Sequence, residues 1–201
     1  MARTQAADYD KRREAIMRTA ADLYAARGFL GTSVGQIAEA GNISKSLLYH
    51  YYQSKEDILF DVMDSHVEAL VEATTAVLEE SLPADKKIRR LSARLMEAYV
   101  EAQSHQKVLL NELVNLPEPR RKLIVDHQRW LLDAVDRLVA EIRPELAKDH
   151  ARRRATTMLF FGMLNWTHTW YDPAGKVKPD AFATMAADTF LAGLAAQDAR
   201  S

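Results

Sequence analysis

The chain has 201 residues, 48% of them hydrophobic, and a formal net charge of −1, so it is long enough for one domain or for a small domain joined to a larger one. It contains no cysteine, which excludes disulfides, thiolate metal sites and cysteine nucleophiles. No apolar run is long enough to span a bilayer, and the first residues lack the apolar stretch of a signal peptide; we therefore expect a cytoplasmic protein without membrane association.

The charge is unevenly divided along the chain. Residues 1–55 hold eight Lys/Arg and five Asp/Glu, whereas residues 56–201 hold nineteen and twenty-three. Binding to phosphates depends on a local basic face rather than on the charge of the whole chain. The division favours a nucleic-acid-binding N-terminal part on an acidic body.

Helical periodicity dominates the chain, and no segment shows sustained period-2 alternation. We predict an all-α fold of about nine helices, in which a three-helix DNA-binding domain precedes a larger helical domain. The first helix is expected over residues 10–27, with Gly28 as its C-terminal stop.

Two short helices, over residues 33–40 and 44–52, form a predicted helix-turn-helix. Ser33 and Gln36 make a capping box at the start of the first, and Ser44 caps the second. Gly41 is expected to take a left-handed backbone conformation in the turn between them. Such a pair places its second helix in the major groove of DNA.

The second of these helices is predicted to turn Leu48 inward and its polar residues outward. Lys45, in the first turn, is suited to donate to a guanine edge, whereas Tyr49 and His50 are suited to hold phosphates. The alternative is an ordinary solvated helix face. The predicted DNA-contacting residues, with two at helix starts where backbone N–H groups favour anions, are Ser33, Ser44, Lys45, Ser46, Leu47, Tyr49, His50 and Lys55.

The order of residues in this region closely resembles the N-terminal signature of TetR/AcrR-family transcriptional repressors, over about the first 70 residues. The motifs are Phe29-x-x-Thr32-Ser33, Ile37-Ala38-Glu39-Ala40-Gly41 and Leu48-Tyr49-x-Tyr51-Tyr52-x-Ser54-Lys55-Glu56. Two positions depart from the pattern. Leu47 replaces a residue that is often small, which suggests an apolar contact such as one to a thymine methyl. Tyr52 replaces the more usual Phe, and we expect its hydroxyl to face solvent.

A long helix follows, opened by a capping box of Ser54 with Asp57 and continuing to about Glu80. It joins the two predicted domains, which are residues 1–54 for DNA binding and residues 55–201 for ligand binding and dimerisation. The remaining helices are expected over about 85–104, up to 115, up to 143, 148–170 and 179–196, with prolines between several of them.

The resemblance implies that the last two helices form a four-helix bundle with those of a partner subunit. Residues 156–166 are apolar nearly all round, as expected of a helix buried on two sides, and the last helix offers a second apolar stripe. Packing within a single chain is the alternative. We predict a homodimer on a palindromic operator, because such operators share the two-fold symmetry of the protein.

Residues 165–173 resemble the corresponding segment of family members that sense acyl-CoA thioesters. The predicted effector is therefore a small apolar molecule, with an acyl-CoA thioester as the specific candidate. Arg120–Lys122 and Arg152–Arg154 are candidate phosphate contacts, for which a solvated helix face is the alternative. The predicted effector-binding residues, for which core packing is the alternative, are Met96, Tyr99, Leu110, Leu113, Leu131, Phe161, Asn165 and Trp166.

No metal or cofactor is predicted, because the six histidines are scattered and none lies four residues from another. Glu101 and His105 have a ligand-like spacing, but one such pair is common by chance. The chain also lacks a Gly-rich phosphate loop, a nucleophile elbow and a paired-carboxylate motif, so we do not expect an enzyme. The leading hypothesis is a repressor released from its operator by a ligand. A DNA-binding regulator without a ligand, controlled by a protein partner, is the alternative.

Overall fold

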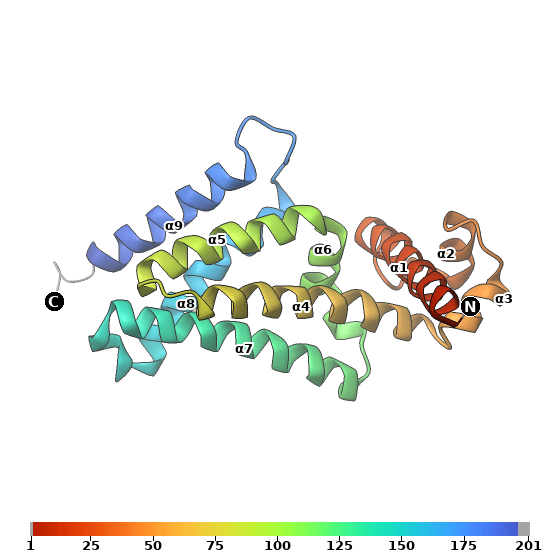
Figure 1. Ribbon diagram of the computed structural model, residues 1–201, viewed down its shortest axis with the longest axis horizontal. Coiled ribbons are helices and arrows are strands. Elements are labelled where there is room, and N and C mark those ends of the chain that lie inside the picture. The colour runs from red at the N-terminus through yellow and green to blue at the C-terminus, as the bar shows by residue number, and fades with distance from the viewer. Residues whose placement is uncertain (1, 197–201) are drawn as a thin grey trace. The chain divides into compact units, whose positions relative to one another are not determined.

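The computed structural model describes residues 2–196, with side chains from Tyr9 onward, and this part of the chain holds nine α-helices and no strand (Figure 1). The predicted all-α fold is confirmed. No helix in the described part is both long and apolar enough to cross a bilayer. The helices are α1 (Ala2–Arg27), α2 (Val34–Ala40), α3 (Lys45–Tyr51), α4 (Lys55–Glu79), α5 (Ala84–Glu101), α6 (Gln103–Asn111), α7 (Glu118–Ile142), α8 (His150–Asn165) and α9 (Pro179–Ala196), with short 3-10 turns η1 (Leu113–Asn115), η2 (Pro144–Ala147) and η3 (Trp166–Thr169).

The backbone contacts divide the chain into two compact units. The first, here called the head unit, comprises residues up to Val67 together with Ala102–Val125. The second, the body unit, comprises Glu68–Glu101 and the residues from Asp126 onward. The predicted domain boundary between residues 54 and 55 stays a prediction.

The head unit is built on α1, which packs against α2 and α6. Its core consists of apolar side chains from the first four helices, among them Tyr24, Ile37, Leu48 and Ile58. Helix α1 begins at Ala2 rather than at the predicted Asp10. The added turns contain Ala2, Ala6 and Ala7, and alanine is the strongest helix former, but they lack the apolar periodicity on which the prediction rested.

The turns of the head unit confirm one glycine prediction and correct another. Gly28 has φ +75 and ends α1, as predicted. Gly41 has φ −80, and Asn42 takes the left-handed conformation instead, with φ 50. Asparagine tolerates this region better than other side chains do. A glycine fits at position 41 for a different reason, because an added Cβ would lie only 3.2 Å from the Ile37 carbonyl oxygen.

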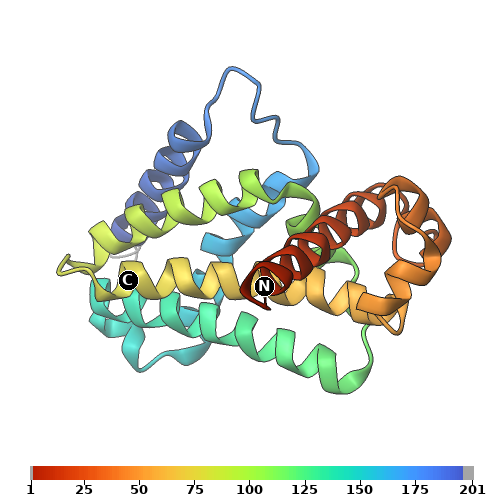
Figure 2. The ribbon, with the colours of Figure 1, turned by 45° about the vertical axis from the view of Figure 1, so that its right-hand side comes forward.

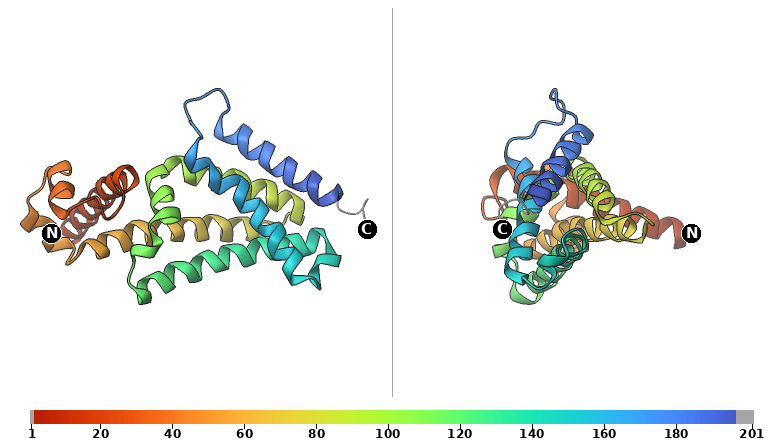
Figure 3. Two further views of the ribbon diagram at one scale, coloured as in Figure 1. Left: turned by 180° about the vertical axis from the view of Figure 1, so that it is seen from behind. Right: turned by 90° about the vertical axis from the view of Figure 1, so that its left-hand side faces the viewer.

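In the body unit, α5 packs against α9, and α8 packs against both (Figures 1 and 2). Apolar residues of α5, α8 and α9 form its core, among them Leu95, Phe160, Leu164 and Phe190. The segment between η3 and α9 arches away from the helices of this unit (Figure 3). One side of α8 and of α9 thus lies against this core, and the other side faces solvent.

Helix α8 ends at Asn165, five residues before the predicted end, and the chain continues as the 3-10 turn η3. Side chains in the turn bond to carbonyls three residues back: Thr167 Oγ1 donates to Leu164 O at 2.6 Å, and Thr169 Oγ1 to Trp166 O at 2.8 Å. Such local bonds compete with the α-helical pattern. The helix tightens and stops for this reason.

Candidate nucleic-acid interface and effector region

The short helix α3 presents most of its side chains to solvent. Ser44 caps it, accepting from the Leu47 backbone N–H at 3.0 Å, and Leu48 is 0% exposed, as the inward orientation predicted. The residues predicted to contact DNA from this helix are exposed or, for Leu47, half-buried: Ser44, Lys45, Ser46, Leu47, Tyr49 and His50. A face of hydroxyl, ammonium, imidazole and phenol groups can donate to bases and to phosphates.

Lys45 lies across the start of α2. A Cβ added at Gly35 would come within 2.8 Å of Lys45 Cε and 3.0 Å of its Nζ. Gly35 therefore leaves room for the lysine stem beside Ser33, another predicted contact whose side chain is exposed and makes the predicted capping box with Gln36. The sequence prediction did not identify this role of Gly35, because it depends on a contact between two helices.

The side chain of Lys55 is engaged within the head unit. Its ammonium donates to the carbonyls of Phe29 at 2.8 Å and Thr32 at 2.9 Å, and lies 4.0 Å from the centre of the Phe29 ring. It thus holds the segment between α1 and α2 against the start of α4, where Ser54 and Asp57 form the predicted capping box. Its role as a DNA contact stays a prediction.

Tyr52, where we expected a solvent-facing hydroxyl, is buried, and its hydroxyl is shielded from solvent. Arg13 forms an ion pair with Asp61, and the Arg13 guanidinium lies 5.9 Å from the centre of the Tyr52 ring. Burial, followed by the charge of Asp61, raises the pKa of Tyr52. The expectation was wrong because side chains of α1 and α4, Arg13 and Asp61, lie around this position.

A buried histidine lies elsewhere in the head unit, between α4 and α6. Nε2 of His66 is 2.8 Å from Oε1 of Gln106, and the His66 ring centre is 6.2 Å from that of His105. Burial lowers the pKa of His66 to about 4 and also lowers the pKa of His105. His66 is therefore neutral in the folded head unit at neutral pH.

The predicted effector-binding residues are divided between the two units. Leu110 and Leu113 belong to the head unit and are half-buried. In the body unit the side chains of Met96, Tyr99, Leu131 and Phe161 are buried, Asn165 is half-buried, and Trp166 is 64% exposed.

One pair of these residues is in direct contact, since the Tyr99 hydroxyl donates to Asn165 Oδ1 at 2.7 Å. Thr167, which was not predicted, lies beside this pair, with Oγ1 4.0 Å from Met96 Sδ. The assignment of these residues to an effector site stays a prediction.

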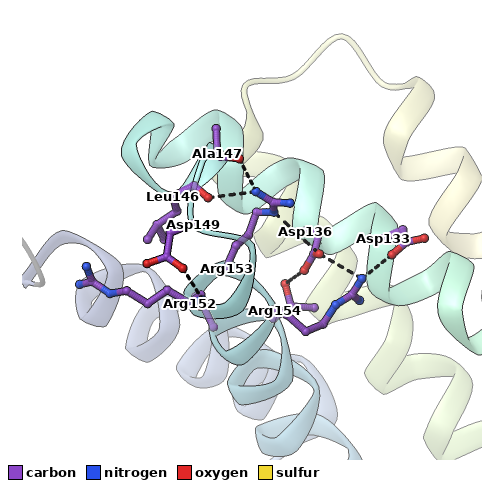
Figure 4. Close-up of polar contacts among 10 residues, drawn as sticks. Asp133, Asp136, Leu146, Ala147, Asp149, Arg152, Arg153 and Arg154 are labelled. Carbon is purple, nitrogen blue, oxygen red and sulfur yellow. Dashed lines mark hydrogen bonds and ion pairs between the residues drawn. The ribbon is translucent and has the colours of Figure 1, made fainter.

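Most of the arginines considered as phosphate contacts have protein partners (Figure 4). Arg153 donates to the carbonyls of Leu146 and Ala147, and Arg154 pairs with Asp133 and with Asp136 at 3.1 Å. The buried Asp136 also accepts from Thr157. In the head unit, Arg120 pairs with Asp57 and Arg121 with Glu118. Arg154 thus joins α8 to α7, and Arg120 joins α7 to α4, which a charge run in sequence did not reveal.

The outer surface of α8 and α9 exposes large apolar side chains: Met158 and Leu159 on α8 and Met185 on α9. The predicted stripe of α9 divides, because Ala186, Phe190 and Leu194 are buried within the body unit while Met185 and Thr189 face solvent. A Cβ added at Gly162 or Gly193 would meet no atom within 4 Å. The surface therefore carries three large apolar side chains and has room for close approach at two glycines.

Two protein-family models match the chain. The one described as bacterial regulatory proteins, tetR family, matches residues 16–62, and the one described as tetracyclin repressor-like, C-terminal domain, matches residues 81–194. The HTH-type transcriptional repressor KstR2 of Mycolicibacterium smegmatis is 26% identical over 195 residues, which cover 91% of this chain and 90% of KstR2.

Solved structures share the fold. A TetR-family transcriptional regulator from Bordetella parapertussis 12822 is 38% identical, with a TM-score of 0.87, and the match covers 89% of this chain and 93% of that one. The structure of AibR in complex with isovaleryl coenzyme A and operator DNA is 23% identical, with a TM-score of 0.78 and coverage of 89% and 97%.

Proposed function

Because the chain belongs to the TetR family of transcriptional regulators, we propose that it is a homodimeric repressor that binds a palindromic operator through α3 and is released by a small apolar effector. The observation that carries the DNA-binding part is the exposed face of α3, with Leu48 as the only buried residue of that helix. A seven-residue helix that presents Lys45, Tyr49 and His50 outward suits the major groove and the phosphates beside it. We assign the protein to the cytoplasm, where this function would be exercised.

The outer surface of α8 and α9 supports the dimer. Met158, Leu159 and Met185 would leave water on contact with the same surface of a second copy, and burial of apolar area drives such association. Two heads related by a two-fold axis would meet the two halves of a palindrome.

An acyl-CoA thioester is the effector class that we propose. AibR, whose fold this chain shares, has been crystallised with isovaleryl coenzyme A, and a structural relative from Mycobacterium tuberculosis is described as the ketosteroid transcriptional regulator KstR2. In the body unit, the hydrogen-bonded Tyr99 and Asn165 offer polar groups, and Met96, three residues before Tyr99 on α5, is buried. Release requires only that the thioester prefer the conformation that does not fit DNA.

The test has two stages. First, the purified protein is used to enrich duplexes from a randomised DNA library, and the enriched sequences are expected to contain an inverted repeat. Next, the affinity for the enriched duplex and the thermal stability are measured with a series of acyl-CoA thioesters, with coenzyme A and the free acids as controls. A thioester at about a hundred times its dissociation constant stabilises a protein by about 2.7 kcal/mol.

Each stage can contradict its own part of the proposal. Failure to enrich any duplex would refute DNA binding. Enrichment with no effect of any thioester on stability or on DNA affinity would refute the effector class and leave the DNA-binding part standing.

A further inference from the structure

The first turns of α1 contact the end of α3 through an aromatic cluster. The Tyr9 ring stacks on the Tyr51 ring, with centroids 4.6 Å apart and planes 33° apart. Tyr9 also meets His50 edge-on at 6.5 Å, and His50 meets Tyr51 edge-on at 5.5 Å. Aromatic pairs at these separations attract one another beyond the area that they bury.

Tyr9 lies outside the N-terminal segment that the family model matches. The family model begins at residue 16, and the sequence prediction placed the start of α1 at Asp10. The tyrosine is nonetheless at the predicted DNA-binding face, since His50 is one of the expected phosphate contacts. Tyr9 is 40% exposed as a residue although its ring is stacked on one face.

Within α3, Leu48 is the one buried residue and Tyr51 is half-buried. Tyr52, the residue directly after the helix, is also buried. These two buried side chains hold the inner side of the helix. The Tyr9 ring, stacked on Tyr51 and in contact with His50, adds a restraint on the outward side of the last turn from a second helix.

We propose that Tyr9 is a positioning residue for the recognition helix: it holds His50 and the last turn of α3 in the orientation that meets DNA. The inference rests on the proposed DNA-binding function. It extends the DNA-binding machinery beyond the family core to a residue that does not itself need to touch the nucleic acid. The ring carries the effect and the hydroxyl does not, which separates positioning from a direct hydrogen bond to a phosphate.

The experiment measures affinity for a duplex enriched by the wild-type protein and for a random-sequence duplex of the same length. Tyr9→Ala is expected to weaken binding to the enriched duplex about fivefold, in line with the loss of one aromatic pair. Tyr9→Phe, the matched control, is expected to bind within about twofold of wild type. Tyr9→Leu, which keeps an apolar side chain without a ring, covers the case in which Tyr9→Ala fails to fold, and the same loss is expected of it.

A double-mutant cycle with His50→Ala separates positioning from general stabilisation. If Tyr9 acts through His50, the loss from Tyr9→Ala shrinks once His50 is absent, because residues in contact do not act additively. Equal losses in both backgrounds would overturn the inference, as would wild-type affinity in Tyr9→Ala and Tyr9→Leu. A Tyr9→Phe loss as large as that of Tyr9→Ala would instead show a direct contact of the hydroxyl. Failure of the wild-type protein to enrich DNA would refute the proposed function itself, and that outcome precedes any variant.

Discussion

Helices α3 and α8 use their outward surfaces in opposite ways. Helix α3 buries only Leu48 and presents hydroxyl, ammonium and aromatic groups to solvent. Helix α8 buries five residues, including Phe160 and Leu164, and still exposes Met158 and Leu159 on its other side. A polar outer face can recognise a charged polymer without further burial, whereas an apolar outer face is stable in water only when another apolar surface covers it. The two helices thus indicate two kinds of partner.

The basic side chains of α3 and α8 also differ in whether they are exposed to solvent or held by groups of the protein. Lys45 in the head unit is exposed on the helix that we assign to DNA. Arg153 and Arg154 in the body unit are held by backbone carbonyls and by the carboxylates of Asp133 and Asp136 (Figure 4). A guanidinium that already pairs with a carboxylate has less to offer a phosphate. Counting charges along the sequence therefore misjudges where an anion would bind.

The largest expected effect comes from removing the anchor of α3. Leu48→Ala should lower the free energy of unfolding of the head unit by about 3–4 kcal/mol, since the side chain is fully buried, and should abolish DNA binding. Leu95→Ala in the body unit is the matched control, because Leu95 is equally buried. It should cost a similar free energy while the folded protein keeps its DNA affinity. Denaturant unfolding and titration of an enriched duplex measure both. Wild-type DNA affinity in Leu48→Ala would remove the distinction between the two regions.

A charge on the outer face of α8 tests whether a second copy covers that face. Leu159→Glu should weaken dimerisation roughly a hundredfold, about 3 kcal/mol, because a carboxylate would be enclosed without a partner. Leu123→Glu, at a leucine of α7 with similar exposure, should leave the dimer intact. Sedimentation over a range of protein concentrations measures both. An unchanged dimer in Leu159→Glu would move the interface elsewhere.

Acidic pH should destabilise the folded protein through His66. Its pKa is about 4 when folded and 6.5 ordinarily, so the unfolded chain takes up the proton first as pH falls below 6.5. The free energy of unfolding should drop by at most about 1.4 kcal/mol per pH unit, and by about 1.6 kcal/mol in all from pH 6.5 to pH 5. Above about pH 7.5 this contribution is constant.

His66→Gln isolates the contribution of this histidine, because the carboxylates titrate alike in both proteins. The difference in stability between variant and wild type, followed by denaturant unfolding at each pH, should shrink as pH falls to 5. A parallel pH profile in the two proteins would contradict the assignment. His105→Gln should show the same sign, since the pKa of His105 is lowered as well.

The helices could be predicted because their signals are local. Capping boxes at Ser33 and Ser54 and the stop at Gly28 involve residues within one turn of each other, and each is present in the structure. The errors arose where the signal was weak or shared. The first turns of α1 carry no apolar stripe. Glycine and asparagine both tolerate the left-handed conformation, so the residue types alone do not decide between Gly41 and Asn42.

For the candidate site, the sequence could predict only which side of α3 faces outward. The helical periodicity of α3 showed this, because placing Leu48 inward determines which side chains point to solvent. The engagement of Lys55 with the segment between α1 and α2, the burial of the Tyr52 hydroxyl and the stacking of Tyr9 on Tyr51 all join different helices. A periodic pattern in one helix contains no information about such contacts.

Among the effects that compare the two regions, the smallest is expected at an exposed aromatic residue of α3. Tyr49 is 52% exposed, and Tyr49→Ala should weaken binding to enriched and random duplexes alike by about tenfold, because a phosphate contact carries no sequence information. The salt dependence of binding should not change, since tyrosine carries no charge that releases counterions. Trp170→Ala, at an aromatic residue of the body with 57% exposure, should leave DNA binding without effector unchanged. A loss confined to the enriched duplex would instead place Tyr49 against a base edge, and the outward face of α3 would then read sequence along its whole length.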